Sequence, residues 1–484
     1  MSERLDLVVL GGGTGGLVCA MIAAETGARV ALVERARTGG DCLWTGCVPS
    51  KTLIATAALA HGMRHADDVG LQPTEPRIDL RAVMAHVRRT IAAIEPHDSP
   101  ARLRAAGVQV IQADGRFAGP GALLAGDRLL RFRAAIIATG SRPALPPIPG
   151  LSSASALTSD TIWDLKRLPD RLAVLGGGPI GCELSQAFAR LGARVTLVEM
   201  AERLLAREEP HAGELIAERL REEGVEVRLS RRGGEVRASE EGRGWLVLEP
   251  AAGSAGGGEV VEFDQLLVAG GREPRTVGIG LEHVGVELDQ RGAIRVDERL
   301  RTTAPGIYAV GDVTGLLPFT HVAAHHARVA TPNALFHARG RVARTVPWVT
   351  FTDPEVARVG LTEAEARERW GERARISQFD YSSLDRAVTA GRAHGFAKLI
   401  GDHRGRLVGA TVAAPGGGEA IAELTAWIST GARIDRISRT VHAYPTLAEG
   451  PARAADAQLA ARYQTPRARA ATRTALALLR AIGR

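Results

Sequence analysis

The order of apolar, glycine and polar positions over residues 7–34 recurs over residues 173–199. Each stretch opens with a short apolar run, passes through a glycine-rich turn into a helical segment, and ends with a second apolar run. The helical segments stop at Gly27 and Gly192, which are 165 positions apart. Apolar runs of this length bounded by glycines are typical of buried strands, so each copy predicts a strand, a tight turn, a helix and a strand.

The turn in each copy has the spacing Gly-x-Gly-x-x-Gly, which is typical of dinucleotide binding when it joins a strand to a helix. The glycines are Gly11, Gly13 and Gly16 in the first copy and Gly176, Gly178 and Gly181 in the second. Glu34 and Glu199 end the second strands, where each carboxylate could accept hydrogen bonds from a ribose diol. A carboxylate repels a 2′-phosphate, so Glu199 favours NADH over NADPH, and nearby Arg203 weakens that preference.

Further apolar runs extend this organisation to the whole chain. Strands ending in turns are expected over 134–140, 266–272 and 307–312, and from about residue 344 the pattern changes to α+β. The predicted fold class is α/β, with two Rossmann-like dinucleotide-binding domains and a C-terminal α+β domain. The expected boundaries are 1–150, completed by about 272–343, then 151–271, 344–460 and a basic tail, 461–484.

Two of the four cysteines, Cys42 and Cys47, lie in one glycine-rich segment after the first βαβ unit. On an ideal helix their Cα atoms would be about 8.6 Å apart, too far for a disulfide, but the surrounding glycines allow other geometries. A cysteine pair beside a βαβ unit favours redox chemistry. A zinc site would need two further ligands, and His61 and His65 do not give zinc-like spacing, so no metal is expected.

Taken together, the glycine turns and the cysteine segment resemble those of the flavin-dependent pyridine nucleotide–disulfide oxidoreductases, such as glutathione reductase, dihydrolipoamide dehydrogenase and mercuric reductase. The resemblance spans about residues 5–455. It rests on the two glycine turns, the GGDCLWTGCVPSK segment at 39–51, Ala138-Thr139-Gly140, Gly311-Asp312 and the segment 442–446.

The resemblance implies that the first unit binds FAD and the second NAD(P)H, and that the C-terminal domain forms a homodimer interface. By the same resemblance Asp312 binds the ribityl chain of the flavin. The implied FAD residues are the first glycine turn with Glu34, Gly40, Thr139, Gly140, Gly311 and Asp312; those for NAD(P) are the second turn with Glu199 and Gly271.

The resemblance also implies a relay of two electrons from NADH through the flavin to a Cys42–Cys47 disulfide. Cys47 corresponds to the flavin-facing thiolate and Cys42 to the thiol that attacks a disulfide or another thiophilic substrate. Lys51 and Glu183 match an ion pair beside the flavin ring; the alternative for Glu183 is a carboxylate on a helix surface.

Two positions depart from the family pattern. Trp44 stands where the family usually has asparagine. Tyr444 replaces the histidine that, with a glutamate matched by Glu449, protonates the leaving thiol. A phenol with a pKa near 10 is a poor proton shuttle at neutral pH, and His442 could substitute only if its loop turned inward. Mercuric reductases also carry tyrosine there but use C-terminal cysteines, and this chain has none after Cys182; interface packing is the other interpretation of Tyr444.

Composition changes this picture mainly at the C-terminus. The 484 residues, enough for about three domains, carry a net charge of +7. Residues 461–484 contain six arginines and no acid, leaving 55 basic and 54 acidic residues elsewhere, so no nucleic-acid partner is expected. Read as a helix, the tail has Arg469, Arg473, Arg480 and Arg484 on one stripe. Packing on the dimer or fraying is favoured over peripheral membrane contact.

Cysteine usage and the acidic start of the chain favour a cytoplasmic enzyme. The leading function is an NAD(P)H-dependent reductase acting through Cys42 and Cys47. The alternatives are mercuric ion reduction, thiol oxidation of the dihydrolipoamide dehydrogenase type, and a low-turnover flavin redox sensor or membrane-associated interaction protein.

Overall fold

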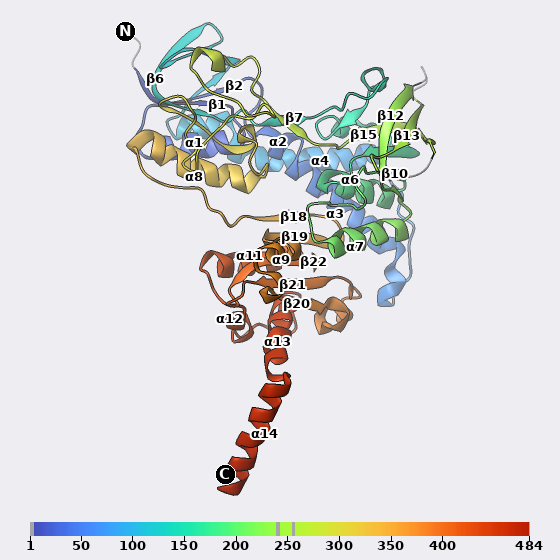
Figure 1. The fold of residues 1–484 in the computed structure, drawn as a ribbon. Coiled ribbons are helices and arrows are strands. Elements are labelled where there is room, and N and C mark those ends of the chain that lie inside the picture. The colour runs from blue at the N-terminus through green and yellow to red at the C-terminus, as the bar shows by residue number, and fades with distance from the viewer. Residues whose placement is uncertain (1–3, 239–242, 254–256, 484) are drawn as a thin grey trace.

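The computed structural model describes residues 4–238, 243–253 and 257–483. Three large sheets, of seven, five and five strands, organise the described residues, and Figure 1 shows the first two side by side above the C-terminal domain. The first is mixed, with antiparallel strands at one edge, and the second is parallel. Both carry helices, so the predicted α/β class with Rossmann-type units is confirmed.

The first sheet has the order β3-β2-β1-β6-β5-β4, with β17 paired to β6. Its strands are β1 (Leu5–Leu10), β2 (Val30–Glu34), β3 (Gln109–Gln112), β4 (Gly115–Gly119), β5 (Ala122–Ala125), β6 (Arg128–Ile137) and β17 (Ile307–Ala309). Helices α1 (Thr14–Glu25) and α8 (Thr320–Phe336) pack together on one face over buried apolar residues. The late strand β17 therefore returns the chain to the sheet in which it began.

The second sheet is parallel throughout, has the order β11-β10-β9-β15-β8 and is flanked by a three-stranded antiparallel sheet. The strands are β8 (Leu157–Thr158), β9 (Arg171–Leu175), β10 (Arg194–Val198), β11 (Glu226–Arg228), β12 (Arg231–Ala238), β13 (Gly244–Pro250), β14 (Glu259–Phe263) and β15 (Gln265–Val268). Two helices belong to this part, α6 (Pro179–Arg190) and α7 (Pro210–Glu222). A two-stranded ribbon, β7 (Ser141–Pro143) with β16 (Arg272–Pro274), lies where the chain enters and leaves it.

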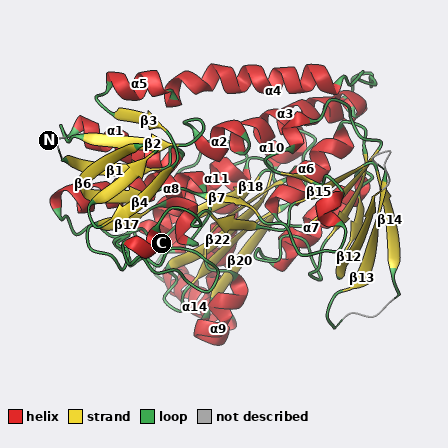
Figure 2. Cartoon of the chain, turned by 90° about the horizontal axis from the view of Figure 1, so that it is seen from above, coloured by secondary structure: helices red, strands yellow, loops and turns green. Residues whose placement is uncertain are grey.

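Three helices follow the first βαβ unit: α2 (Gly40–Trp44), α3 (Cys47–Arg64) and α4 (Leu80–Ile94). A short helix, α5 (Pro100–Ala105), precedes β3. Helix α3 packs on α4 and on α6, and one apolar core joins these helices to the second sheet. The segment that carries the cysteines is thus held between the two dinucleotide units, as Figure 2 shows from above.

The C-terminal domain is a five-stranded antiparallel sheet in the order β18-β19-β22-β21-β20. Its strands are β18 (Pro347–Thr350), β19 (Glu355–Gly360), β20 (Arg375–Asp380), β21 (Phe396–Gly401) and β22 (Leu407–Ala414). Its helices are α9 (Glu363–Trp370), α10 (Asp385–Thr389), α11 (Gly417–Ser429), α12 (Ile434–Ser438) and α13 (Glu449–Tyr463). A last helix, α14 (Pro466–Ala481), extends from α13 away from the rest of the chain (Figure 1).

Among the described residues, no helix is both long and apolar enough to cross a membrane.

Candidate functional site

The two glycine turns have the same local geometry. Gly11 and Gly176 have φ values of +107° and +111°, which L-residues rarely adopt. A Cβ atom on Gly16 would lie 1.8 Å from the carbonyl oxygen of Gly11, and the corresponding distance in the second turn is the same. Only glycine therefore lets each helix start so close to its strand.

Each turn also leaves the start of its helix open to an anion. Gly13 and Gly178 are the N-caps of α1 and α6, and neither helix has a side chain that caps its first amides. A Cβ on Gly178 would meet no atom within 4 Å, and one on Gly13 would meet only Gly40, at 3.7 Å. Free amides beside open space are what a pyrophosphate requires, so both turns fit a dinucleotide.

Glu34 and Glu199 are held by the turns themselves. Each carboxylate accepts a backbone hydrogen bond at 2.6 Å from the middle of its glycine turn, from Gly12 or Gly177. The other oxygen of each accepts from an amide two residues on, at 2.8 Å. These bonds fix both carboxylates at the end of the second strand, and the remaining lone pairs are those that a ribose diol could use.

The other expected flavin-binding residues gather around the first turn. Gly40 has a φ of +59°, and a Cβ there would lie 2.6 Å from the Cα of Gly13, so α2 packs directly on the turn. The Asp312 carboxylate accepts a hydrogen bond from the Ser141 hydroxyl at 2.7 Å. The Gly311 amide donates to His326 at 3.2 Å.

Thr139, Gly140 and Gly271 lie at the ribbon between the two units. The Thr139 hydroxyl donates to the carbonyl of Arg275 at 2.7 Å. Gly140 and Gly271 have φ values of +70° and +141°, and a Cβ on either would meet no atom within 4 Å. Thr139 and Gly140 and the residues around the first turn come from distant parts of the sequence to one end of the first sheet, and together they fit FAD. Gly271, expected to bind NAD(P), lies at the other strand of the ribbon, next to Arg272.

The two cysteines are adjacent because the helix breaks between them. Helix α2 ends at Trp44, and α3 begins at Cys47 after Thr45 and Gly46. A Cβ on Gly46 would lie 2.9 Å from the carbonyl oxygen of Asp41, so the break needs a glycine. The interruption, and not an ideal helix, brings the thiols of Cys42 and Cys47 within hydrogen-bond reach.

The two thiols are electrostatically different. Hydrogen bonding from Cys42 is the main effect that lowers the pKa of Cys47, to about 6, with further lowering by Thr320 and Lys51 against the opposing effect of burial. The pKa of Cys42 is raised, first because its thiol donates to Cys47 and second because of burial. Cys47 is thus the thiolate of the reduced pair at neutral pH.

Thr320 is a contact that the sequence analysis did not identify. Its hydroxyl lies 3.3 Å from the Cys47 sulfur. Thr320 is the first residue of α8, the helix that follows Asp312. Cys47 therefore faces the elements that fit FAD.

Lys51 and Glu183 form the expected pair. The Lys51 ammonium lies one turn along α3 from Cys47 and 2.7 Å from the Glu183 carboxylate. The lysine side chain is 35% exposed and the glutamate 7%. The second Glu183 oxygen accepts from the Phe351 amide at 2.9 Å, and the ammonium lies 4.4 Å above the Phe351 ring. Glu183 is therefore a buried, doubly bound carboxylate and not one on a helix surface.

Trp44, which stands where the family usually has asparagine, is partly buried and packs against the apolar core that joins α3, α4 and α6. Its indole donates to the Thr38 carbonyl at 2.7 Å, and the Arg37 guanidinium lies 3.8 Å above its ring. On the preceding turn Asp41 is ion-paired with Arg272 of the ribbon. Neither Asp41 nor Arg272 carried a signal that distinguished it from ordinary charged residues in the sequence.

Tyr444, His442 and Glu449 are not brought to the cysteine pair of their own chain. Tyr444 is exposed and its hydroxyl donates to Asp385 at 2.8 Å, which raises its pKa. His442 lies 3.0 Å from Glu423. The Glu449 carboxylate accepts a hydrogen bond at 3.2 Å from the amide of Thr446, which lies two residues after Tyr444. Within the described residues, no hydrogen bond or ion pair joins this loop to Cys42 or Cys47.

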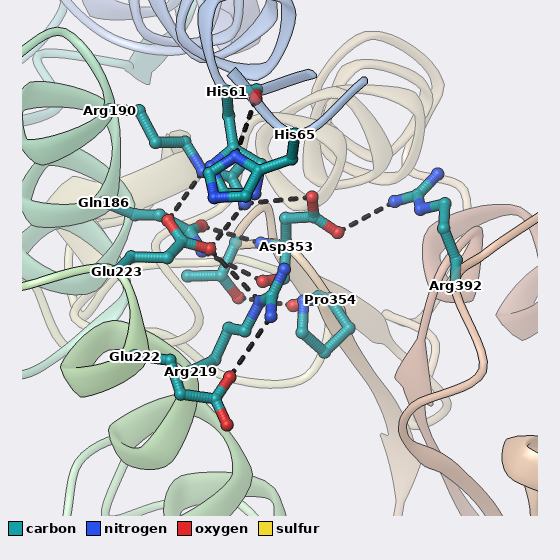
Figure 3. A network of polar contacts seen from close by, with 11 residues as sticks. His61, His65, Gln186, Arg190, Arg219, Glu222, Glu223, Asp353, Pro354 and Arg392 are labelled. Carbon is teal, nitrogen blue, oxygen red and sulfur yellow. Dashed lines mark hydrogen bonds and ion pairs between the residues drawn. The ribbon is translucent and has the colours of Figure 1, made fainter. Parts of the chain in front are cut away.

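A buried polar cluster occupies the far end of α6 from Glu183, and we call it the Arg190 cluster (Figure 3). Its members are Gln186, Arg190, Glu223 and Asp353. Arg190 binds Glu223 through two nitrogens, both at 2.7 Å, and Asp353 at 3.0 Å. Gln186 donates to Glu223 at 3.1 Å and exchanges two hydrogen bonds with the Asp353 backbone.

The Arg190 cluster joins three parts of the molecule. Arg190 is on α6, Glu223 directly follows α7, and Asp353 belongs to the C-terminal domain. Helix α3 reaches it through Arg64, which donates to the Arg190 carbonyl at 2.5 Å. His61, also on α3, has its pKa lowered to about 4, chiefly by burial and next by Arg190, so its imidazole is neutral at pH 7.

No group of three or more potential metal ligands lies together among the described residues.

Comparisons with known proteins agree with this geometry. The family profile described as pyridine nucleotide-disulphide oxidoreductase matches residues 5–327, and the profile for the dimerisation domain of that family matches 346–455. A mercuric reductase of Streptomyces lividans is 39% identical over 92% of this chain and 94% of its own length. A dihydrolipoyl dehydrogenase of Thermus scotoductus is 37% identical over 94% of this chain and 97% of its own.

Among solved structures, the flavoprotein disulfide reductase RclA from Escherichia coli, induced by HOCl and solved as a Cu(II) complex, has a TM-score of 0.83. It shares 27% sequence identity, and the match covers 94% of this chain and 99% of that one.

Proposed function

Because this chain belongs to the pyridine nucleotide-disulphide oxidoreductase family of flavoprotein enzymes, we propose that it reduces a disulfide or another thiophilic acceptor through Cys42 and Cys47. The observation that carries the proposal is the pKa split between the two thiols, which leaves Cys47 as thiolate beside Lys51. When bound, FAD supplies a group that accepts hydride from a reduced nicotinamide and returns two electrons to the Cys42–Cys47 disulfide.

The residues divide the acceptor step between them. The thiolate of Cys47 is the nearest base for the Cys42 proton, because the Cys42 thiol donates to it. Deprotonated Cys42 attacks one sulfur of the acceptor disulfide, forms a mixed disulfide, and releases the other sulfur as a thiolate that takes up a proton. Cys47 passes the proton that it took from Cys42 to this first thiolate. The Cys47 thiolate then attacks the Cys42 sulfur, which re-forms the Cys42–Cys47 disulfide and releases the second sulfur as a thiolate that takes a proton from solvent.

Tyr444 bears on which acceptors are turned over well. Its hydroxyl donates to Asp385 and its pKa is raised, so it is a weak general acid near pH 7. Thiol oxidation of the dihydrolipoamide type, which needs an efficient base, is therefore the less favoured direction. A metal ion such as Hg(II), which needs no leaving thiol to be protonated, is the second candidate acceptor, and one relative with this activity in its name is 39% identical.

We propose NADH as the preferred donor. Glu199 ends β10 with both carboxylate oxygens bound to backbone amides, and a 2′-phosphate beside it would be repelled. Arg203, the nearest cation in sequence, donates to the Ala206 carbonyl at 3.0 Å.

A homodimer is also proposed, because the dimerisation profile covers the loop that holds Tyr444. In such a dimer, the loop of one protomer could serve the cysteines of the other, which the loop of the same protomer does not reach.

The test is steady-state NADH oxidation by the FAD-loaded protein with lipoamide, glutathione disulfide and Hg(II). We expect at least one acceptor to support turnover that both Cys42→Ser and Cys47→Ser abolish, while Cys19→Ser, which changes a buried thiol on α1 that is not part of the cysteine pair, keeps it. Turnover of every acceptor by Cys42→Ser at the wild-type rate would overturn the proposal.

A further inference from the structure

Helix α14 is a complete helix with no buried residue. The Thr465 side chain accepts from the Ala468 amide at its start, Pro466 occupies the first turn, and no residue of the helix is buried. In Figure 1 it continues beyond α13 and points away from all three domains. The sequence favours packing on the dimer or fraying; within this chain no residue of α14 is buried, and Arg484 of the predicted arginine stripe lies outside the described residues.

The helix has two chemically different faces. Arg469, Arg473 and Arg480 recur at the spacing that places them on one side of a helix. Leu478, Leu479 and Ile482 lie on the other side and are 63%, 44% and 68% exposed. The rest of that apolar side is alanine, at positions 468, 471 and 475. Two residues depart from this division, Arg467 beside the apolar face and Leu476 beside the arginines.

The charge of the helix identifies the kind of surface that it fits. Residues 461–484 hold six arginines and no acid, whereas the rest of the chain is almost balanced. An amphipathic helix with arginines on one side and exposed leucines on the other is the pattern of helices that lie in the surface of an anionic membrane. Pairing with a second copy would use the same apolar face, but that face offers only three large side chains, all within its last turns.

We propose that α14 lies in the surface of an anionic lipid bilayer, with Leu478, Leu479 and Ile482 among the acyl chains and the arginines at the lipid phosphates. Gln464 and Thr465, between α13 and α14, set this helix apart from the catalytic body, so binding leaves the cysteine site open. If the enzyme is a homodimer, as proposed above, two such helices bind together and strengthen attachment.

The experiment is sedimentation of the full-length holoenzyme with vesicles of phosphatidylglycerol and phosphatidylcholine, or of phosphatidylcholine alone. We expect at least tenfold tighter binding to the anionic vesicles. Truncation after Gln464 and the triple change of Arg469, Arg473 and Arg480 to Gln should each remove this difference. A control that changes Arg237, Arg295 and Arg301 to Gln removes the same charge from exposed positions on the body and should bind within twofold of wild type.

A second variant separates the membrane from other partners. Leu478→Ser with Ile482→Ser keeps the charge but removes the apolar contact, so vesicle binding should fall several-fold while NADH oxidation is unchanged. Equal binding by the full-length and truncated proteins would overturn the proposal. It would also be overturned if truncation changed the oligomeric mass in solution without affecting vesicle binding. The same holds if, in a parallel assay with duplex DNA, the arginine changes weakened DNA binding but left vesicle binding unchanged.

Discussion

Glu183 of the Lys51–Glu183 pair and Arg190 of the Arg190 cluster lie on the same helix, α6, two turns apart, and differ in what surrounds them. At one end Lys51, 35% exposed, binds the buried Glu183, one turn from Cys47, the thiolate of the proposed reaction. At the other end Arg190, only 3% exposed, binds Glu223 and Asp353, and no reacting group is near. The difference teaches that similar ion pairs on one helix can serve chemistry at one end and domain arrangement at the other.

The largest expected effect on stability comes from breaking the Arg190 cluster. Arg190→Ala would remove the two-nitrogen contact to buried Glu223, which then keeps only the cation of Arg219, at 3.2 Å, and one of the two cations of Asp353. Removing one partner of a buried pair costs up to about 3–5 kcal/mol. We expect a large fall in the melting temperature and faster proteolysis between the domains, with turnover per folded molecule little changed. Arg301→Ala, which breaks an exposed pair with Asp297, is the control and should barely move the melting temperature. Equal shifts for the two variants would contradict the comparison.

Breaking the Lys51–Glu183 pair should instead lower turnover more than stability. Lys51→Met removes a cation that lowers the pKa of Cys47, so that pKa should rise and turnover fall by about 100-fold, as when one charge-stabilising group is lost. The melting temperature should change less than in Arg190→Ala, because Lys51 is partly exposed and binds one acid, Glu183, which keeps the Phe351 amide, whereas Arg190 binds two acids. Lys166→Met, at an exposed lysine, is the matched control. A stability loss in Lys51→Met as large as that in Arg190→Ala would remove the distinction.

A smaller effect tests the Arg190 cluster by pH. Arg190 and Arg392 hold the pKa of Asp353 at about 2 against the opposing effect of burial, below its ordinary 3.8. A depressed carboxyl pKa stabilises the fold above pH 3.8 and loses that stabilisation as pH falls toward 2, about 2 kcal/mol in all and about half of it by pH 3. Asp353→Asn should therefore flatten the stability profile between pH 6 and pH 3. An unchanged slope would show that Asp353 does not titrate with this shift.

Much of the fold and the cofactor cradle could be predicted from the sequence because short-range patterns determine them. Glycine spacing, apolar runs and a terminal glutamate are local, and the two turns in the structure differ little from each other. Lys51 and Glu183 were found only through the family resemblance, since 132 positions separate them.

The Arg190 cluster and Thr320 could not be predicted in this way. Arg190 reads as an ordinary basic residue at the end of a helix, and its partners come from α7 and from a loop in another domain. Thr320 reads as a helix-start residue, and its contact with Cys47 spans 273 positions. Contacts between domains depend on how finished elements pack, and a single sequence carries no local signal for them.

The central claim is that the reduced cysteine pair is split, with Cys47 ionised and Cys42 protonated. The direct measurement is a pH titration of the reduced holoenzyme by thiolate ultraviolet absorbance, with iodoacetamide labelling mapped by mass spectrometry. The account predicts a thiolate that forms at an apparent pKa of about 6, disappears in Cys47→Ser and persists in Cys42→Ser, whose hydroxyl can still donate. A titration that persists in Cys47→Ser and disappears in Cys42→Ser would contradict the assignment.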